Sequence, residues 1–381
     1  METSSVVKTS VGIVRKQSFH LENYITVGGR KLREASIGWE SYGTLNAAKS
    51  NAILIPHYFS GNSHAAGKYR EDDALPGYWD SIIGPGKAID TNKYFVIGVD
   101  SLTNLNTKDG ITITTGPSSI NPDSGKPYGM TFPVVTLPDF VRLQKSLLDQ
   151  LGITRLHAVI GCSMGAQQAY EWAAAYPDMV DRIVPISGVP SQKAYALVMI
   201  ESWAAPVRLD RHWNNGNYYG GPEPAAGAAL GYYNLLIDSL HPELIATLYG
   251  HAAADSGLAP LDAIDHQFLC ESALKTQAAL GAARADPNHL LYMARACQLF
   301  IAGTSGCSVD PSLKNIRAKT LVIQVRTDLI FPSADARVVV AKLKENGTDA
   351  EFHELDSSGG HLAIVNEIHK ASNLIRSFLD R

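Results

Sequence analysis

The sequence predicts an α/β protein in which a mostly parallel sheet carries helices on both faces and an inserted helical lid. Two observations predict this class. Up to residue 188, short apolar runs typical of buried strands alternate with segments of helical composition. The alternation stops over residues 189–300, which are rich in Ala, Leu, Tyr and His, and it resumes over 301–381. We therefore expect a core formed by residues 1–188 and 301–381, with residues 189–300 as the lid.

The expected elements follow in order along the chain. The first strand begins near residue 36, and apolar runs at 51–56 and 94–99 have the length of further buried strands. A helix is expected over 139–151, where apolar residues recur near helical spacing. The later elements are a strand leading to residue 160, a helix at 165–176, strands at 182–186, 319–325 and 350–355, and helices at 333–345 and 362–379.

Composition narrows the class of protein. The chain has 381 residues, of which 45% are apolar and 18% charged, and its formal net charge is -4. These values are typical of a globular protein, and the absence of a basic run argues against a nucleic-acid partner. No apolar stretch reaches the length of a membrane span, and the first residues lack the pattern of a secretory leader. We therefore expect a cytoplasmic protein with no membrane partner.

The cysteines indicate neither a metal site nor a disulfide framework. Cys162, Cys270, Cys297 and Cys307 are scattered and show no C-x-x-C spacing. We expect no bound metal and no cofactor. Cys162 is interpreted as a small buried filler beside the strand end.

Residues 161–165 have the pattern G-x-S-x-G and lie between an apolar run and a segment of helical composition. Strand, sharp turn and helix are the context of the nucleophile elbow in the α/β-hydrolase fold. Ser163 is therefore the predicted nucleophile, and the backbone N–H of Met164 is the predicted first donor to an acyl oxygen. The alternative is a tight strand-to-helix turn with an inert serine.

In this fold the acid precedes the histidine along the chain. Asp328 directly follows the strand at 319–325, and His361 lies on the loop after the last strand, so these are the predicted acid and base. Asp328 could instead cap the helix that begins near residue 333, and His361 could be an ordinary residue at a helix start. Asp356 is a weaker rival for the acid, because it is too close to His361 on the same loop.

The second oxyanion donor is expected on the loop after an early strand. Residues 57–64 form such a loop, and the backbone N–H of Phe59 is the predicted donor. The alternative is an ordinary glycine-containing loop.

Several long strings resemble the homoserine O-acetyltransferase family of the α/β-hydrolase superfamily, from about residue 35 to 188 and from about 310 to the end. The strings are IGPGKAIDT at 83–91, TGPSSINP at 115–122, GKPYG at 125–129, FPVVT at 132–136 and the elbow itself. The resemblance implies that Ser163, Asp328 and His361 form a triad and that Phe59 and Met164 are the oxyanion donors. It also implies ping-pong transfer of an acyl group from acyl-CoA to a hydroxyl, a helical lid over a tunnel, and a homodimer through that lid.

Two positions depart from the family. Members that act on homoserine keep an aspartate after the triad histidine for the substrate amine, and here that residue is Leu362. They also keep a lid arginine for the substrate carboxylate, and here the matching residue is Tyr232. Each lost charged hydrogen bond is worth about 1.5–3 kcal/mol. We expect homoserine to bind poorly and a neutral or more apolar substrate to fit the pocket formed by these residues.

Two functions use the same residues. The first is an O-acyltransferase that works through an acyl-serine on a small hydroxylated acceptor other than homoserine. The second is a short-chain ester hydrolase with water as the acceptor, and a non-catalytic binding protein is a minor third. The expected partners are a small-molecule acyl donor and acceptor.

Overall fold

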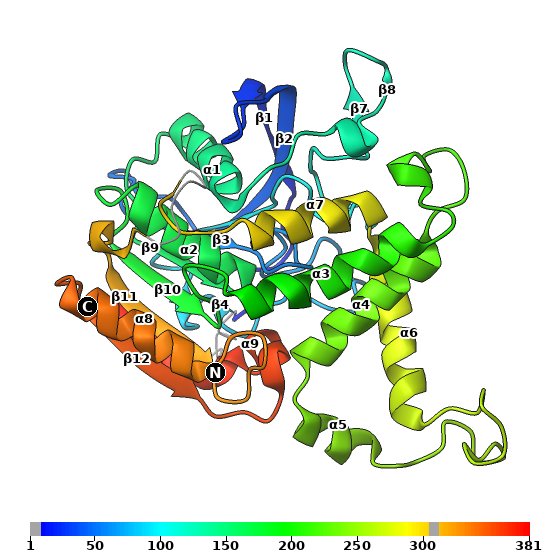
Figure 1. The fold of residues 1–381 in the computed structure, drawn as a ribbon. Helices are drawn as coiled ribbons and strands as arrows, with labels where there is room; N and C mark the ends of the chain where they lie inside the picture. The colour runs from blue at the N-terminus through cyan, green and yellow to red at the C-terminus, as the bar shows by residue number, and fades with distance from the viewer. Residues whose placement is uncertain (1–8, 305–311) are drawn as a thin grey trace, which may run out of the picture.

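The computed structural model describes residues 9–304 and 312–381, and structural statements below refer to those residues; Cys307 lies outside them. At the centre is an eight-stranded sheet (Figure 1). Its order is β1 (Gln17–Ile25), β2 (Lys31–Tyr42), β6 (Phe95–Val99), β3 (Ala52–Pro56), β9 (Ala158–Cys162), β10 (Arg182–Ile186), β11 (Lys319–Val325) and β12 (Ala350–Leu355). The pairs β1–β2 and β2–β6 are antiparallel, and every pair from β6 to β12 is parallel. The predicted α/β class with a mostly parallel sheet is confirmed.

The hairpin of β1 and β2 is the part of the sheet that the sequence analysis missed. The first strand was expected near residue 36, which lies inside β2. In β1 only Phe19 and Tyr24 are buried, and exposed or half-buried residues fill the remaining positions. Because this edge strand buries so few side chains, no apolar run in the sequence indicates it.

Helices cover both faces of the sheet, because successive strand residues point to opposite sides. Leu54 belongs to the apolar core that includes α1 (Leu137–Leu151), α2 (Met164–Ala175) and α8 (Ser333–Glu345). Its neighbours Ile53 and Ile55 belong to the opposite core, which includes α10 (Ser372–Leu379). The strands that carry the site are thus packed from both sides.

Helix α1 begins two residues before its predicted start at 139. Thr136 caps it, and Asp139 accepts hydrogen bonds from the Thr136 backbone N–H and hydroxyl, each at 2.8 Å. Asp139 also accepts from the hydroxyl of Tyr24 at 2.8 Å. This capping box ties the helix to the edge hairpin.

The prediction of a single helix over 362–379 is wrong. The segment is broken into η4 (Gly360–Leu362), α9 (Ala363–Asn366), η5 (Ile368–Ala371) and α10. The break falls at Glu367, which has φ -125° and accepts a hydrogen bond from the hydroxyl of Ser357 at 3.0 Å. The side chain at the break is thus tied to the loop that precedes η4.

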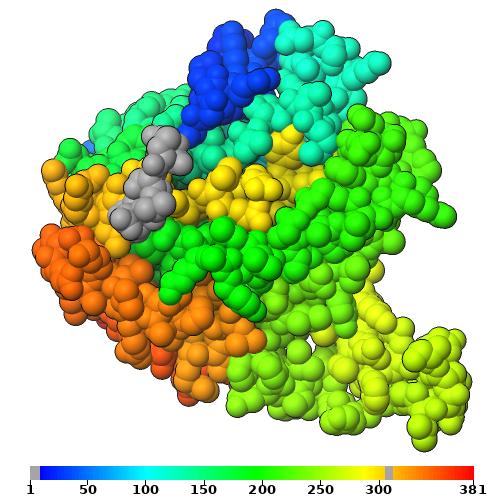
Figure 2. Space-filling view, in the orientation of Figure 1, coloured from blue at the N-terminus to red at the C-terminus, as the bar shows by residue number. Residues whose placement is uncertain are grey.

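A helical insertion lies between β10 and β11, as predicted. Its helices are α3 (Ala194–Leu209), α4 (Ala225–Ser239), α5 (Pro242–Tyr249), α6 (Leu269–Arg284) and α7 (Pro287–Gln298). Glycines allow α4 to cross α3 closely, because a Cβ at Gly231 would lie 2.2 Å from the Trp203 carbonyl oxygen. Helix α5 and the loop after it project from the body (Figures 1 and 2). The boundaries 189 and 300 stay a prediction.

Short elements complete the description: β4 (Ile83–Gly84), β5 (Ile89–Asp90), β7 (Ile120–Asn121), β8 (Lys126–Pro127), η1 (Gly129–Thr131), η2 (Asn214–Gly216) and η3 (Leu313–Asn315). Across the described ranges, no helix combines the length and the apolar character that crossing a membrane requires.

A buried carboxyl group on α2 makes the stability of the fold depend on pH. Glu171 is 4% exposed, and its Oε2 accepts the backbone N–H of Gly303 at 2.7 Å. Burial raises the pKa of Glu171 from 4.5 to about 7. Between these values the folded chain holds a proton that the unfolded chain has lost, so stability falls as pH rises through this window.

We expect Glu171→Gln to remove this loss, because the amide stays neutral and its oxygen still accepts from Gly303. The difference in free energy of unfolding between the variant and the wild type should therefore grow in favour of the variant by roughly 2–3 kcal/mol from pH 4.5 to pH 8. Thermal unfolding at pH 4.5, 6 and 8 measures it. The exposed Glu345→Gln is the control, and parallel curves for Glu171→Gln and the wild type would contradict the prediction.

Candidate active site

Ser163 lies at a strained turn between β9 and α2. Its φ of 55° and ψ of -120° are outside the regions that a side chain normally allows. The turn needs small neighbours on both sides. A Cβ at Gly161 would lie 2.3 Å from the Gly165 carbonyl oxygen, and a Cβ at Gly165 would lie 2.2 Å from that of Pro56. The G-x-S-x-G pattern is therefore a steric requirement of this turn.

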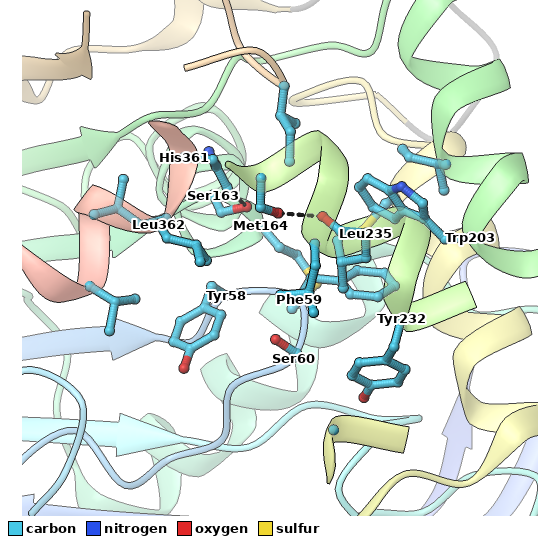
Figure 3. A pocket seen from close by; sticks show the side chains of 18 of the residues that line it. Tyr58, Phe59, Ser60, Ser163, Met164, Trp203, Tyr232, Leu235, His361 and Leu362 are labelled. Carbon is cyan, nitrogen blue, oxygen red and sulfur yellow. Dashed lines mark hydrogen bonds between the residues drawn. The ribbon is translucent and has the colours of Figure 1, made fainter. Parts of the chain in front are cut away.

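Three predicted residues meet at this turn, and Figure 3 shows two of them, Ser163 and His361. His361 Nε2 lies 2.8 Å from Ser163 Oγ, and His361 Nδ1 lies 2.7 Å from Asp328 Oδ2. All three are at least nine-tenths buried. Because a carboxylate only accepts hydrogen bonds, Nδ1 carries the proton and Nε2 accepts from the serine hydroxyl. This arrangement can take a proton from Ser163.

Asp328 is held by the backbone that follows it. Its Oδ1 accepts the N–H groups of Ile330 at 2.9 Å and Phe331 at 3.0 Å, both before the start of α8. The carboxylate therefore does not cap α8, which was the alternative reading. His361 does lie in a short helix, η4, but its ring nitrogens are both engaged by Asp328 and Ser163.

Thr327, which the sequence analysis did not single out, joins the acid loop to the histidine loop. Its buried hydroxyl donates to the Ser357 carbonyl at 2.7 Å and accepts the N–H of Gly360 at 3.1 Å. Gly360 has φ +66°, and a Cβ there would lie 2.6 Å from the backbone nitrogen of His241 in the insertion. The histidine is thus positioned between the core and the lid.

Asp356, the rival acid, faces solvent. Its side chain is 86% exposed and its Oδ1 lies 2.8 Å from Arg326 Nε. A carboxylate committed to a surface ion pair does not orient the histidine.

The loop after β3 carries Phe59, whose N–H is the second predicted oxyanion donor. The carbonyl oxygen of Tyr58 accepts from His57 Nδ1 at 2.7 Å and from the N–H of Gly61 at 2.9 Å. In a trans peptide the C=O and the following N–H point to opposite sides. These two bonds therefore fix the direction of the Phe59 N–H from behind the loop.

The tautomer of His57 follows from its other contacts. Its Nε2 lies 3.1 Å from Asn104 Nδ2. The same Nδ2 donates to the Gly61 carbonyl at 3.0 Å, while Asn104 Oδ1 accepts the N–H of Asn106 at 3.0 Å, so the amide orientation is determined. Nε2 is then an acceptor and Nδ1 carries the proton. Burial lowers the pKa of His57, which keeps the ring neutral.

A cavity of about 230 Å³ opens on Ser163 and His361. Tyr232 and Leu362 both line it, on opposite sides in Figure 3. Most of its lining is apolar, including Phe59, Met164, Trp203, Leu235, Phe331 and Leu362. Among the described residues that line it there is no Asp or Glu, and Arg284 is its one Lys or Arg.

Three residues that line this cavity each have a buried polar atom without a hydrogen-bond partner among the described residues. These atoms are Gln167 Nε2, Gln192 Oε1 and the hydroxyl of Tyr232. The sequence analysis named only the last of these residues, and an unpaired glutamine leaves no pattern in a sequence. Across the described part of the chain no group of three or more His, Cys, Asp or Glu residues could hold a metal ion.

The fold and a match to a known family define the class of enzyme to which the chain belongs. The model of the alpha/beta hydrolase fold family matches residues 52–367. With the parallel sheet and helical insertion described above, this defines an α/β-hydrolase-fold enzyme.

Relatives within that class narrow the family. Homoserine O-acetyltransferase of Solidesulfovibrio magneticus is 38% identical over 379 residues, covering 98% of this chain and 94% of the relative. The crystal structure of homoserine O-acetyltransferase from Bacillus anthracis matches with a TM-score of 0.92 and 38% identity over 97% of this chain and 98% of that one. The crystal structure of esterase E22 matches with a TM-score of 0.92 and 46% identity over 96% of this chain and all (100%) of that one. The chain belongs to the homoserine O-acetyltransferase family.

We expect Ser163→Ala to lose on the order of a millionfold in kcat and Asp328→Asn about ten-thousandfold, while Asp356→Asn stays within about twofold of the wild type. The first two changes remove the nucleophile and the partner of Nδ1, whereas the third touches only a surface pair. Release of p-nitrophenol from p-nitrophenyl acetate measures all three, with circular dichroism as a check of folding. A larger loss of kcat in Asp356→Asn than in Asp328→Asn would show that Asp356, and not Asp328, is the acid of the triad.

Proposed function

We propose that the protein cleaves short-chain acyl esters through an acyl-enzyme on Ser163, and that its acceptor is water and not homoserine. The observation that carries this proposal is the cavity beside Ser163, whose described lining is mostly apolar and contains no carboxylate. An ammonium group entering it would lose its hydration without gaining an ionic partner. A neutral acyl ester meets no such cost.

In the first step Ser163 Oγ attacks the acyl carbon as His361 Nε2 takes its proton. The negative oxygen that forms is stabilised by the N–H groups of Met164 and Phe59. The start of α2 contributes its positive end, and the His57–Tyr58 contact keeps the Phe59 N–H in place. His361 then returns the proton to the departing alkoxide, which leaves as an alcohol.

In the second step His361 takes a proton from the acceptor as the acceptor oxygen attacks the acyl carbon. The bond between that carbon and Ser163 Oγ then breaks, and His361 returns the proton to Oγ. Asp328 stabilises the imidazolium in both steps without taking its proton. An alcohol competes with water only if the site holds it in position. The two charged contacts that would hold homoserine are absent at Tyr232 and Leu362, and this favours water.

Transfer to a small hydroxylated acceptor other than homoserine is the second candidate. Membership of a family of acetyltransferases favours it, and the higher identity to esterase E22 favours hydrolysis. The same acyl-enzyme serves both reactions. The ratio of transfer to hydrolysis, measured as added alcohols compete with water for the acyl group, separates them.

We expect measurable hydrolysis of neutral short-chain esters and negligible acetyl transfer from acetyl-CoA to homoserine. The reason is that the homoserine ammonium has no carboxylate to pair with among the described residues that line the cavity. Steady-state kinetics with p-nitrophenyl acetate, and with acetyl-CoA plus homoserine, measure both. A kcat/KM for homoserine above about 10⁴ M⁻¹s⁻¹, the lower end of ordinary enzyme efficiency, would contradict the proposal.

Leu362→Asp is a gain-of-function test of the same prediction, and Leu362→Asn is its matched control. Leu362→Asp returns a carboxylate to the side of the cavity next to His361, so homoserine transfer should rise relative to neutral ester cleavage. Leu362→Asn adds a polar side chain of the same shape without the charge. Equal transfer by both variants would show that charge at this position is not what homoserine lacks.

We also propose that two copies associate through the insertion, while the cytoplasmic location stays a prediction. The loop after α5, which projects from the body in Figure 2, exposes large apolar side chains: Leu261 is 95% exposed and Ile264 fully so (104%). Exposed apolar groups of this kind are typical of interaction surfaces. Light scattering should give twice the mass of one chain, and Leu261→Ser with Ile264→Ser should halve it. A monomeric wild type would contradict the proposal.

A further inference from the structure

Among the described residues, one Lys or Arg lies on the wall of the cavity, on a helix other than the one expected to carry it. The family arginine was expected at position 232, where the chain has tyrosine. Arg284, at the end of α6, lines the same cavity. Gln277 and Gly281 also line it, and the spacing of 277, 281 and 284 puts all three on one face of α6.

Arg284 and Tyr232 lie close together. The ring of Tyr232 packs on Gly281, where a Cβ would come within 2.7 Å of Tyr232 Cδ1. Burial raises the pKa of Tyr232, and the positive charge of Arg284 opposes that rise. The same charge opposes the rise that burial causes in the pKa of Tyr58 on the facing loop. The guanidinium therefore acts at the wall formed by these two tyrosines.

Neither the Tyr232 hydroxyl nor the Arg284 side chain has a partner among the described residues. The Tyr232 hydroxyl is buried, with the residue 6% exposed, and it has no hydrogen-bond partner among the described residues. Within those residues the Arg284 side chain likewise has no hydrogen bond or ion pair. A buried hydroxyl left unpaired costs free energy, which a bound acceptor atom would recover. Two adjacent donors, one of them charged, suit an anion.

We propose that Arg284 and the Tyr232 hydroxyl form an anion subsite, so that the enzyme prefers substrates that carry a negative group away from the scissile acyl bond and no ammonium group. The inference rests on the proposed ester chemistry at Ser163 and names its substrate class. The anion is a carboxylate on the alcohol part of the ester, or a phosphate of an acyl-CoA donor. Both share the chemistry that the two donors recognise.

The test uses esters matched in size that differ only in charge. They are 4-acetoxybutanoate, 4-acetoxybutanamide and O-acetylhomoserine, which add respectively a carboxylate, a neutral amide, and a carboxylate with an ammonium group. Their affinities are measured by calorimetry with Ser163→Ala, which lacks the nucleophile and cannot cleave the esters, so binding is measured separately from catalysis. We expect the carboxylate ester to bind about tenfold more tightly than the other two.

Adding Arg284→Gln should bring the affinities of the carboxylate and amide esters to within about twofold of each other. Arg284→Lys should keep part of the preference, and Tyr232→Phe should reduce it. Lys275→Gln is the matched control, because it removes a cation from an exposed part of the same helix that does not line the cavity. The preference should also weaken with added salt, since Arg284 is exposed at the cavity wall.

A second pair of ligands identifies the source of the anion. S-acetylpantetheine lacks the phosphates of acetyl-CoA. If Arg284→Gln weakens acetyl-CoA relative to S-acetylpantetheine and leaves the ester pair unchanged, the subsite serves the donor phosphate. If it changes only the ester pair, the subsite serves the carboxylate.

The proposed subsite would be refuted if Arg284→Gln changed neither the relative affinities of the carboxylate and amide esters nor those of acetyl-CoA and S-acetylpantetheine. Hydrolysis of neutral esters by the wild type would then still stand, and the function proposed for Ser163 would be unaffected. Conversely, a clear preference for the anionic ligands without any turnover would leave the subsite standing and refute the ester chemistry.

Discussion

The close approach of α2 to the end of β3 is the constraint on which the rest of this site depends. At Gly165 the helix comes so near the Pro56 carbonyl that no side chain fits. This contact places the first N–H groups of α2 beside the loop that begins at His57, and it requires the chain to turn sharply at Ser163. The strain at Ser163 persists because the sheet is packed on both faces, so the turn cannot relax without displacing β9 from its neighbours.

The proposed reacting groups and much of the cavity wall come from different parts of the molecule. Ser163, Asp328 and His361 lie at the carboxyl ends of core strands, where backbone hydrogen bonds and Thr327 hold them. Much of the cavity wall comes instead from helices of the insertion. Of the two positions that depart from the family, Tyr232 lies on α4 of the insertion, away from the Ser-His-Asp residues in the chain, whereas Leu362 lies in η4 directly after His361.

The sequence predicted what local patterns encode. Apolar runs in the buried strands β10 and β11 placed both to the residue, and the elbow was recognised because its glycines are sterically required. The β1 edge strand was missed because it buries only two side chains and so has no apolar run. The break at Glu367 was missed because the pattern of apolar residues does not show its side-chain contact with Ser357. Arg284 was missed for a similar reason. Nothing near residue 284 indicates that its helix face meets Tyr232, and only the crossing of α4 and α6 brings them together.

The contact between Gly360 and the backbone at 239–241 has a consequence for how such a protein can change over evolutionary time. The loop that carries His361 rests directly on the end of α4, so any insertion or bulky substitution there would also displace the general base. Helix α5 and the loop beyond it meet no such restriction. Variation that alters substrate preference should therefore accumulate along the interior faces of α4 and α6, while the short seam beneath Gly360 remains nearly invariant in length and in side-chain size.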